Sequence, residues 1–176
     1  MKIYIYRLEE GLNELIQDYD AESLDLVTDQ DREVKFMSPV HIRVSINRVS
    51  SQYFFHVFVE ATAIFICDRC LEEFSMALKD DFQLVYTTER SYPLDGDEEL
   101  GIRYLNSECD VIDITEDIRE ATLLAIPMKV LCSEECKGIC PECGINLNNE
   151  SCDHRVERID PRWDVLKGKT DRNKIN

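Results

Sequence analysis

The stretch from Val40 to Cys70 reads V-H-I-R-V-S-I-N-R-V-S-S-Q-Y-F-F-H-V-F-V-E-A-T-A-I-F-I-C-D-R-C. Apolar residues occupy every second position from Val40 to Ile46, and again from Tyr53 to Phe65. A period of two is typical of strands that bury one face. The segment N-R-V-S-S-Q between the two runs turns the chain. The stretch therefore predicts a β-hairpin, which ends at a pair of cysteines, Cys67 and Cys70.

Further elements are expected on both sides of this hairpin. Residues 2–7 alternate briefly and predict a strand, and renewed alternation over residues 76–86 predicts another. Apolar residues recur at helical spacing between these two regions, which predicts a short amphipathic helix near the N-terminus. The apolar residues that carry this prediction are Leu8, Leu12, Leu15, Ile16 and Tyr19.

A second helix is expected after residue 113. Asp113 is suited to cap its first turn, and Glu116 three residues later completes the pattern of a capping box. Pro127 is expected to end the helix. Residues 89–110, before this helix, form a long loop with many acidic residues, and loops of this length are often functional.

These elements indicate an α+β fold in which an antiparallel β-sheet with two or three helices precedes a small C-terminal zinc-binding module. The expected domains are an α+β body (1–129), the zinc-binding module (130–160) and a basic tail (161–176). The chain has 176 residues, of which 44% are hydrophobic, so a buried core is expected. It contains neither a long apolar run nor a secretory signal, which predicts a cytoplasmic protein without a membrane span.

Charge is distributed unevenly along the chain. The net charge is −16, although residues 155–176 hold seven Lys or Arg and only four Asp or Glu. A strongly acidic body is a poor direct binder of a phosphate backbone at physiological salt, because each phosphate contact needs a cation. Two explanations remain open: the acidic surface keeps the protein soluble, or it meets a basic protein partner.

Four of the eight cysteines lie in the stretch L-C-S-E-E-C-K-G-I-C-P-E-C-G, residues 131–144. A reducing cytosol disfavours disulfides, and thiolates at this spacing are typical ligands of Zn²⁺. Glycine after the last cysteine permits the positive φ that such a turn needs. We expect a structural zinc ion held by Cys132, Cys136, Cys140 and Cys143. Cys152 and His154 are alternative ligands that can replace one pair.

Cys67 and Cys70 form a separate C-x-x-C pair with three open interpretations. The pair is half of a site shared with the C-terminal cysteines, or it binds its own metal, or it is a redox dithiol whose pKa is lowered by Arg69. The sequence after Cys70 continues as a strand and not as the helix of a thioredoxin-like unit. This pattern disfavours a redox function. Cys109 has no companion nearby and is expected to be a small packed residue.

The order of these motifs resembles that of the YceD-like family of large ribosomal RNA subunit accumulation proteins. The resemblance rests on C-D-R-C-L after a long strand, D-I-T-E-D-I-R-E, the cysteine block C-S-E-E-C-K-G-I-C-P-E-C-G-I-N-L-N, and D-P-R-W-D-V-L. It covers about residues 30–168. Only some members carry the C-terminal block, which implies that its cysteines complete a site without Cys67 and Cys70. Members often have a second cysteine where this chain has His154.

The resemblance implies a non-enzymatic factor that supports accumulation of 23S ribosomal RNA in large-subunit biogenesis. Because the body is acidic, we expect it to act through a protein partner, either a ribosomal protein or an assembly factor, with at most weak RNA contact through the tail. No small-molecule substrate is expected. Two alternatives are a thiol–disulfide redox protein that uses Cys67 and Cys70, and a zinc-ribbon adaptor in transcription.

Overall fold

The chain forms two compact units that divide between Cys136 and Lys137. The structure, a computed structural model, describes residues 1–26, 34–37, 39–88, 102–106 and 109–154. The first unit thus includes residues 130–136, which the sequence places in the C-terminal module. The expected tail, 161–176, lies outside the described residues, as does most of the loop expected at 89–110.

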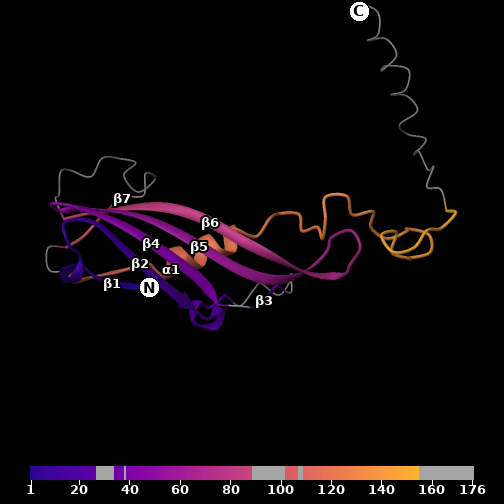
Figure 1. The fold of residues 1–176 in the computed structure, drawn as a ribbon, viewed down its shortest axis with the longest axis horizontal. Helices are drawn as coiled ribbons and strands as arrows, with labels where there is room; N and C mark the ends of the chain where they lie inside the picture. Colours follow the sequence, from indigo (N-terminus) through magenta and orange to yellow (C-terminus); the bar gives the residue numbers. More distant parts are fainter. Residues whose placement is uncertain (27–33, 38, 89–101, 107–108, 155–176) are drawn as a thin grey trace, which may run out of the picture. The chain divides into compact units, whose positions relative to one another are not determined.

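A six-stranded sheet is the centre of the first unit (Figure 1). Its spatial order is β2-β4-β5-β6-β7, and β3 also pairs with β5. The pairs are antiparallel except for β6 with β7, which run parallel. The strands are β2 (Gly11–Tyr19), β3 (Lys35–Phe36), β4 (Val40–Val49), β5 (Gln52–Ile66), β6 (Glu73–Thr87) and β7 (Ile102–Tyr104).

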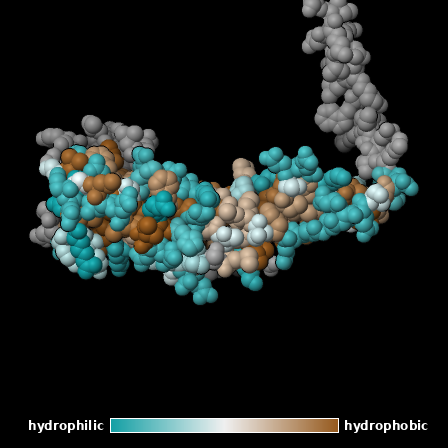
Figure 2. All heavy atoms as spheres, in the orientation of Figure 1, coloured by the Kyte–Doolittle hydropathy of each residue, from teal (hydrophilic) through white to brown (hydrophobic). Residues whose placement is uncertain are grey.

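The predicted hairpin is confirmed as β4 and β5, and the predicted third strand as β6. Val44 lies opposite Val57 in the register, and both are completely buried. Their alternate neighbours face the core from the same side of the sheet, as the period of two requires. The opposite face exposes side chains of mixed character, including Phe54 and Phe58, which are 39% and 42% exposed. Figure 2 shows hydrophobic patches among hydrophilic surface over the sheet.

The N-terminal helix is a wrong prediction, because residues 11–19 form the edge strand β2. This strand pairs with β4 along its whole length, from Gly11 opposite Arg48 to Tyr19 opposite Val40. An edge strand buries its inner side chains only partly, so its alternation is weak. The apolar residues also fit a helical period, and pairing with the hairpin decided the outcome.

A small second sheet joins the N-terminus to the segment just before α1. β1 (Lys2–Tyr4) pairs with β8 (Val111–Asp113), so the predicted strand at 2–7 is present but shorter. Two short 3₁₀ helices, η1 (Ile5–Arg7) and η2 (Ala21–Leu24), flank β2. Ile3 and Ile112 of the small sheet join the core beneath the large one.

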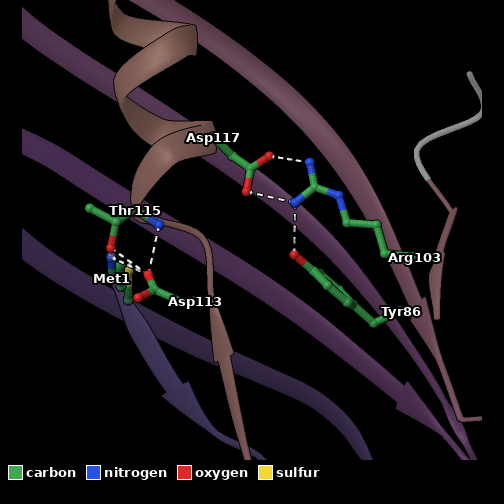
Figure 3. Close-up of polar contacts among 6 residues, drawn as sticks. All are labelled: Met1, Tyr86, Arg103, Asp113, Thr115 and Asp117. Atoms are coloured by element: carbon green, nitrogen blue, oxygen red, sulfur yellow. Dashed lines mark hydrogen bonds and ion pairs between the residues drawn. The ribbon is translucent and has the colours of Figure 1, made fainter. Parts of the chain in front are cut away.

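The predicted helix near residue 113 is confirmed as α1 (Thr115–Leu124), which packs against β5 and β6. Its capping differs from the expected box (Figure 3). Asp113 accepts a hydrogen bond from the backbone N–H of Thr115 at 3.0 Å, and the terminal ammonium of Met1 lies 3.5 Å from the same carboxylate oxygen. Glu116 does not close a capping box, because its carboxylate pairs with Arg119 at 3.1 Å.

Arg103 of β7 connects α1 to β6 through hydrogen bonds that are also drawn in Figure 3. Arg103 on β7 donates to the carboxylate of Asp117 at 2.9 Å and to the hydroxyl of Tyr86 at 3.1 Å. Burial raises the pKa of Tyr86 above its ordinary value, so this hydroxyl stays protonated at neutral pH. Within the described residues α1 is the one α-helix, so the expected second and third helices are not found there. No described helix is both long enough and apolar enough to cross a membrane.

Candidate metal centres

The structure gathers two groups of four metal-ligating side chains, one in each compact unit. In each group the candidate ligand atoms all lie within 4.8 Å of one another. The first group, which we call the sheet cluster, is Cys67, Cys70, Cys132 and Cys136; the second, which we call the C-terminal cluster, is Cys140, Cys143, Cys152 and His154.

This grouping differs from the single site expected from the sequence, which joined Cys132 and Cys136 to Cys140 and Cys143. The structure divides those four residues between the two clusters. Proximity in the sequence suggested the single site, whereas the fold brings β5's end to residues 132–136. The partner of the first pair is therefore Cys67 with Cys70, and the partner of the second is Cys152 with His154. Cys152 and His154 therefore join Cys140 and Cys143 in one cluster and do not replace either of them.

The sulfur positions of the sheet cluster fit a tetrahedral metal ion. Cys67 Sγ lies 3.8 Å from Cys136 Sγ, and Cys70 Sγ lies 3.7 Å from Cys132 Sγ. A zinc ion bound at Zn–S distances of about 2.3 Å requires sulfurs about 3.8 Å apart at the corners of a tetrahedron. A disulfide needs about 2.05 Å, and none of the eight cysteines, all of which lie in the described residues, forms one. The donor set and its spacing therefore fit a thiolate-bound ion such as Zn²⁺.

Two residues between the cysteines of the β5–β6 turn fasten the loop that carries the other pair. Asp68 exchanges two hydrogen bonds with Val130: its N–H donates to the carbonyl at 2.9 Å, and its carboxylate accepts from the N–H at 2.7 Å. Arg69 donates to the carbonyl of Cys136 at 2.8 Å and to that of Glu134 at 3.3 Å. The four thiols are thus positioned by the chain around them, and Arg69 acts on backbone carbonyls.

The turn that presents Cys70 is tight. Leu71 N–H donates to the carbonyl of Cys67 at 3.0 Å, and Cys67 N–H donates to that of Glu72 at 2.9 Å. Leu71 adopts φ of 60°, a left-handed conformation that costs a non-glycine residue free energy. Its side chain is 63% exposed.

The electrostatics of the sheet cluster favour partial ionisation. Burial acts to raise the pKa of Cys67, but backbone N–H groups of Cys132, Cys70 and Arg69 outweigh it and lower the pKa to about 6. Hydrogen bonding to Cys136 and burial raise the pKa of Cys132 to about 12. One thiolate beside closely packed thiols therefore suppresses ionisation of the others. A divalent cation at the centre stabilises all four as thiolates.

The C-terminal cluster is built on a second cysteine turn. Gly144 N–H donates to the carbonyl of Cys140 at 2.8 Å, and Cys140 N–H donates to that of Ile145 at 2.9 Å. Gly144 has φ of 76°, as its position after the C-P-E-C pattern predicted. The loop is fastened again by Asn148, whose side-chain oxygen accepts from Lys137 N–H at 2.8 Å.

In the C-terminal cluster, too, backbone hydrogen bonds lower the thiol pKa values, whereas burial raises them. Backbone N–H groups of Cys143 and Glu142 lower the pKa of Cys140 to about 6. The N–H of His154 acts to lower the pKa of Cys152, but its neighbour Cys140 and burial outweigh this effect, so the pKa is raised. A mixed set of three thiols and an imidazole is, like four thiols, a common donor set for tetrahedral zinc.

Both clusters offer four protein ligands, which is the full complement of a structural site. A catalytic zinc keeps one position open for water or substrate. Cys67 is completely buried, and Cys70 is 4% exposed. Cys109 belongs to neither cluster, and its thiol donates to the carbonyl of Val111 at 3.1 Å. The geometry therefore supports folding of the chain around metal ions more than chemistry on a bound substrate.

The fold and these two closed donor sets define a class: a β-sheet protein whose cysteine turns can hold metal ions. The family model for large ribosomal RNA subunit accumulation protein YceD matches residues 55–168, a range that contains all members of both clusters. The chain belongs to this family. No solved structure matches the chain.

Related proteins match different shares of their own length. An uncharacterized protein of Mycobacterium tuberculosis is 32% identical over 114 residues, which cover 61% of this chain and 51% of that protein. The uncharacterized protein YlbN of Bacillus subtilis is 27% identical over 172 residues, with 95% of both chains covered. In Arabidopsis thaliana, the chloroplastic large ribosomal RNA subunit accumulation protein YCED homolog 1 is 26% identical over 156 residues, or 73% of this chain and 48% of that protein. The chain thus spans about half the length of its mycobacterial and plant relatives.

Proposed function

We propose that this chain is a non-enzymatic factor in biogenesis of the large ribosomal subunit, which supports accumulation of 23S ribosomal RNA in the cytoplasm. The observation that carries the proposal is the family match over residues 55–168. The plant relatives carry the same description in their names. The match begins within β5 and includes β6 and the members of both clusters.

Zinc is the metal we propose for both clusters, in a structural role. The sulfur separations of 3.7–3.8 Å support this assignment for the sheet cluster, and the Cys₃His composition supports it for the C-terminal cluster. Zinc would hold residues 132–136 against the end of the β5–β6 hairpin. Metal analysis of protein purified without chelator tests this assignment, with two zinc ions per chain as the expected value.

The charge of the chain supports action through a protein partner. A net charge of −16 repels phosphates, and a basic ribosomal protein or assembly factor is attracted to the same surface. Affinity purification at moderate salt tests this part of the proposal. Recovery of a basic protein of the large subunit is expected, and recovery of naked ribosomal RNA without any protein would contradict it.

Sucrose-gradient profiles of cells depleted of the protein test the proposed function itself. We expect fewer free large subunits and more unjoined small subunits, because the large-subunit RNA does not accumulate. Re-expression of the protein should restore the profile. A profile that stays normal after complete depletion would count against a role in large-subunit biogenesis.

The redox alternative has less support in the geometry. A dithiol that exchanges with a substrate disulfide needs an accessible thiolate, whereas Cys67 and Cys70 are buried beside two further thiols. Thiol titration of the metal-loaded protein separates the two functions, since the proposed factor should show both cysteines unreactive to mild oxidants. A transcription adaptor would instead copurify with RNA polymerase and not with precursors of the large subunit.

A further inference from the structure

The edge of the large sheet formed by β2 has the features of a docking strand. Within the part of the chain that the structure describes, β2 pairs with β4 and with no other strand. In an antiparallel edge strand, every second residue directs its backbone N–H and C=O away from the sheet. An extended segment from another protein can pair with these groups and continue the sheet.

A groove of about 260 Å³ runs beside this edge, between β2 and the N-terminal elements β1 and η1. Ile3, Leu8 and Leu15 give it an apolar lining. Lys2, Arg7 and Glu14 also line it, so the groove carries charges of both signs beside its apolar lining. The guanidinium of Arg7 lies 5.0 Å from the centre of the Tyr4 ring, which is 40% exposed.

The opposite side of β2 has a different character. Leu12 and Ile16 are 68% and 73% exposed there, and they alternate with the exposed acidic residues Glu14 and Asp18. The carboxylate of Asp18 lies 2.8 Å from the imidazole of His41 on β4, so Glu14 is the carboxylate of the two that we expect an added strand to meet. The whole segment 8–26, which contains β2 and its flanks, has seven Asp or Glu and no Lys or Arg. An added strand would therefore meet the exposed carboxylate of Glu14, which also borders the groove, and the apolar residues Ile3, Leu8 and Leu15.

These two sides select one kind of occupant. A second copy of this chain is disfavoured, since antiparallel pairing of two β2 strands would bring like charges together. An RNA strand is disfavoured because its phosphates would face the same carboxylates. A strand that alternates basic and apolar residues fits both features, with a basic residue beside Glu14 and its apolar residues toward Leu15 and the rest of the apolar lining.

We propose that the edge strand β2 docks an extended segment of a protein partner in which basic and apolar residues alternate. The inference deepens the proposed function, because it specifies how the protein partner of that function would be recognised. Main-chain hydrogen bonds to β2 supply the affinity, and the carboxylates and the groove supply the selectivity.

Fluorescence anisotropy with the full chain and a labelled nine-residue peptide of alternating Lys and Val tests the docking strand. We expect Glu14→Lys to weaken peptide binding about tenfold, since an attraction becomes a repulsion at the site. Glu120→Lys, the same charge change on an exposed position of α1, should leave the affinity unchanged. Equal effects of the two substitutions would reduce the interaction to net charge and overturn the proposal.

Backbone methylation of the peptide tests strand pairing separately from charge. Two peptides are needed, each N-methylated at one of the two alternate sets of residues. Only one set of N–H groups faces β2 in an added strand, so one peptide should lose binding at least tenfold and the other should keep it. Equal binding by both peptides would overturn the strand model. Higher affinity after substitution of the chain's own tail lysines (Lys167, Lys169 and Lys174 to Gln) would assign the edge to that tail and overturn the proposal as well.

The peptide assay and the ribosome profile fail independently. A normal profile after depletion, together with selective peptide binding, would contradict the proposed function and leave the docking strand standing. A disturbed ribosome profile together with unselective peptide binding would contradict the docking strand and leave the proposed function standing. Binding of an unstructured RNA oligonucleotide that competes with the peptide for the wild-type edge would overturn the choice of a protein segment.

Discussion

Replacing one cysteine from each cluster should have consequences that differ in place and in size. Cys136→Ser removes a ligand from the sheet cluster, which joins residues 62 to 69 positions apart in the chain. Cys143→Ser removes a ligand from the C-terminal cluster, whose members lie between residues 140 and 154. Cys109→Ser is the matched control, because Cys109 lies in neither cluster.

The expected magnitude follows from the entropy of loop closure. A bridge across a loop of 62 to 69 residues restricts the unfolded chain by about 4 kcal/mol, whereas one across a dozen residues does so by about 3 kcal/mol. Loss of the sheet cluster's metal should therefore lower the unfolding free energy of the sheet by about 4 kcal/mol. Loss of the other metal should loosen residues 137–154 and leave the sheet as stable as before.

Urea unfolding followed by far-ultraviolet circular dichroism measures this difference. With a slope of about 2 kcal/mol per molar urea, the midpoint for Cys136→Ser should fall by about 2 M. The midpoints of Cys143→Ser and Cys109→Ser should stay near that of the unchanged protein. Native mass spectrometry should find one zinc ion in each cluster variant and two in the control. An equally large fall for Cys143→Ser, or none for Cys136→Ser, would refute the division of ligands between the clusters.

Three further predictions concern the turn and the helix beside the core. Arg69→Ala removes hydrogen bonds to the carbonyls of Glu134 and Cys136, so zinc transfer to a chromogenic chelator should become several-fold faster; an unchanged transfer rate would show that Arg69 does not fasten this loop. Leu71→Gly removes the strain of a left-handed backbone conformation and should raise the free energy of unfolding by up to about 1 kcal/mol, whereas clear destabilisation would mean that the Leu71 side chain is needed for packing. Burial opposes a low pKa at Asp113, but hydrogen bonds to Thr115 outweigh it and keep the pKa below its usual value, so its contribution to stability is present above the unfolded pKa and is lost as the pH falls through the folded one. Asp113→Asn should therefore show a smaller loss of unfolding free energy between pH 5 and pH 2, and an identical pH profile for the two proteins would contradict this assignment.

The central hairpin could be read from the sequence because its burial is complete on one face. Val44 and Val57 have no exposed surface, and their neighbours on the same strands repeat that environment at every second position. The period of the apolar residues therefore agrees with the burial of their side chains, and both strands could be predicted. The edge strand β2 lacks this agreement, since Leu15 is only partly buried and Ile16 beside it is 73% exposed. Its state depends on pairing with β4, a long-range interaction that a local period does not contain.

The ligand sets show the same division between local and distant information. The turn at Cys140 and Cys143 could be predicted from the sequence, because the pattern C-P-E-C is followed by Gly144, which adopts the positive φ that the turn requires. The cysteines that the structure places beside Cys132 and Cys136 lie across the fold, at the end of β5. Sequence separation favoured Cys140 and Cys143 instead, although a site shared with Cys67 and Cys70 was one of the open interpretations. One signal was available: seven cysteines and His154 complete two tetrahedral sets and leave Cys109 over.

The ratio of large-subunit to small-subunit ribosomal RNA in depleted cells tests the proposed function most directly. Depletion should lower this ratio, and re-expression of the unchanged protein or of Cys109→Ser should restore it. Cys67→Ser, which removes a ligand of the sheet cluster, should fail to restore it even when the variant accumulates to normal levels. An unchanged ratio after complete depletion would contradict the assignment of this protein to large-subunit biogenesis.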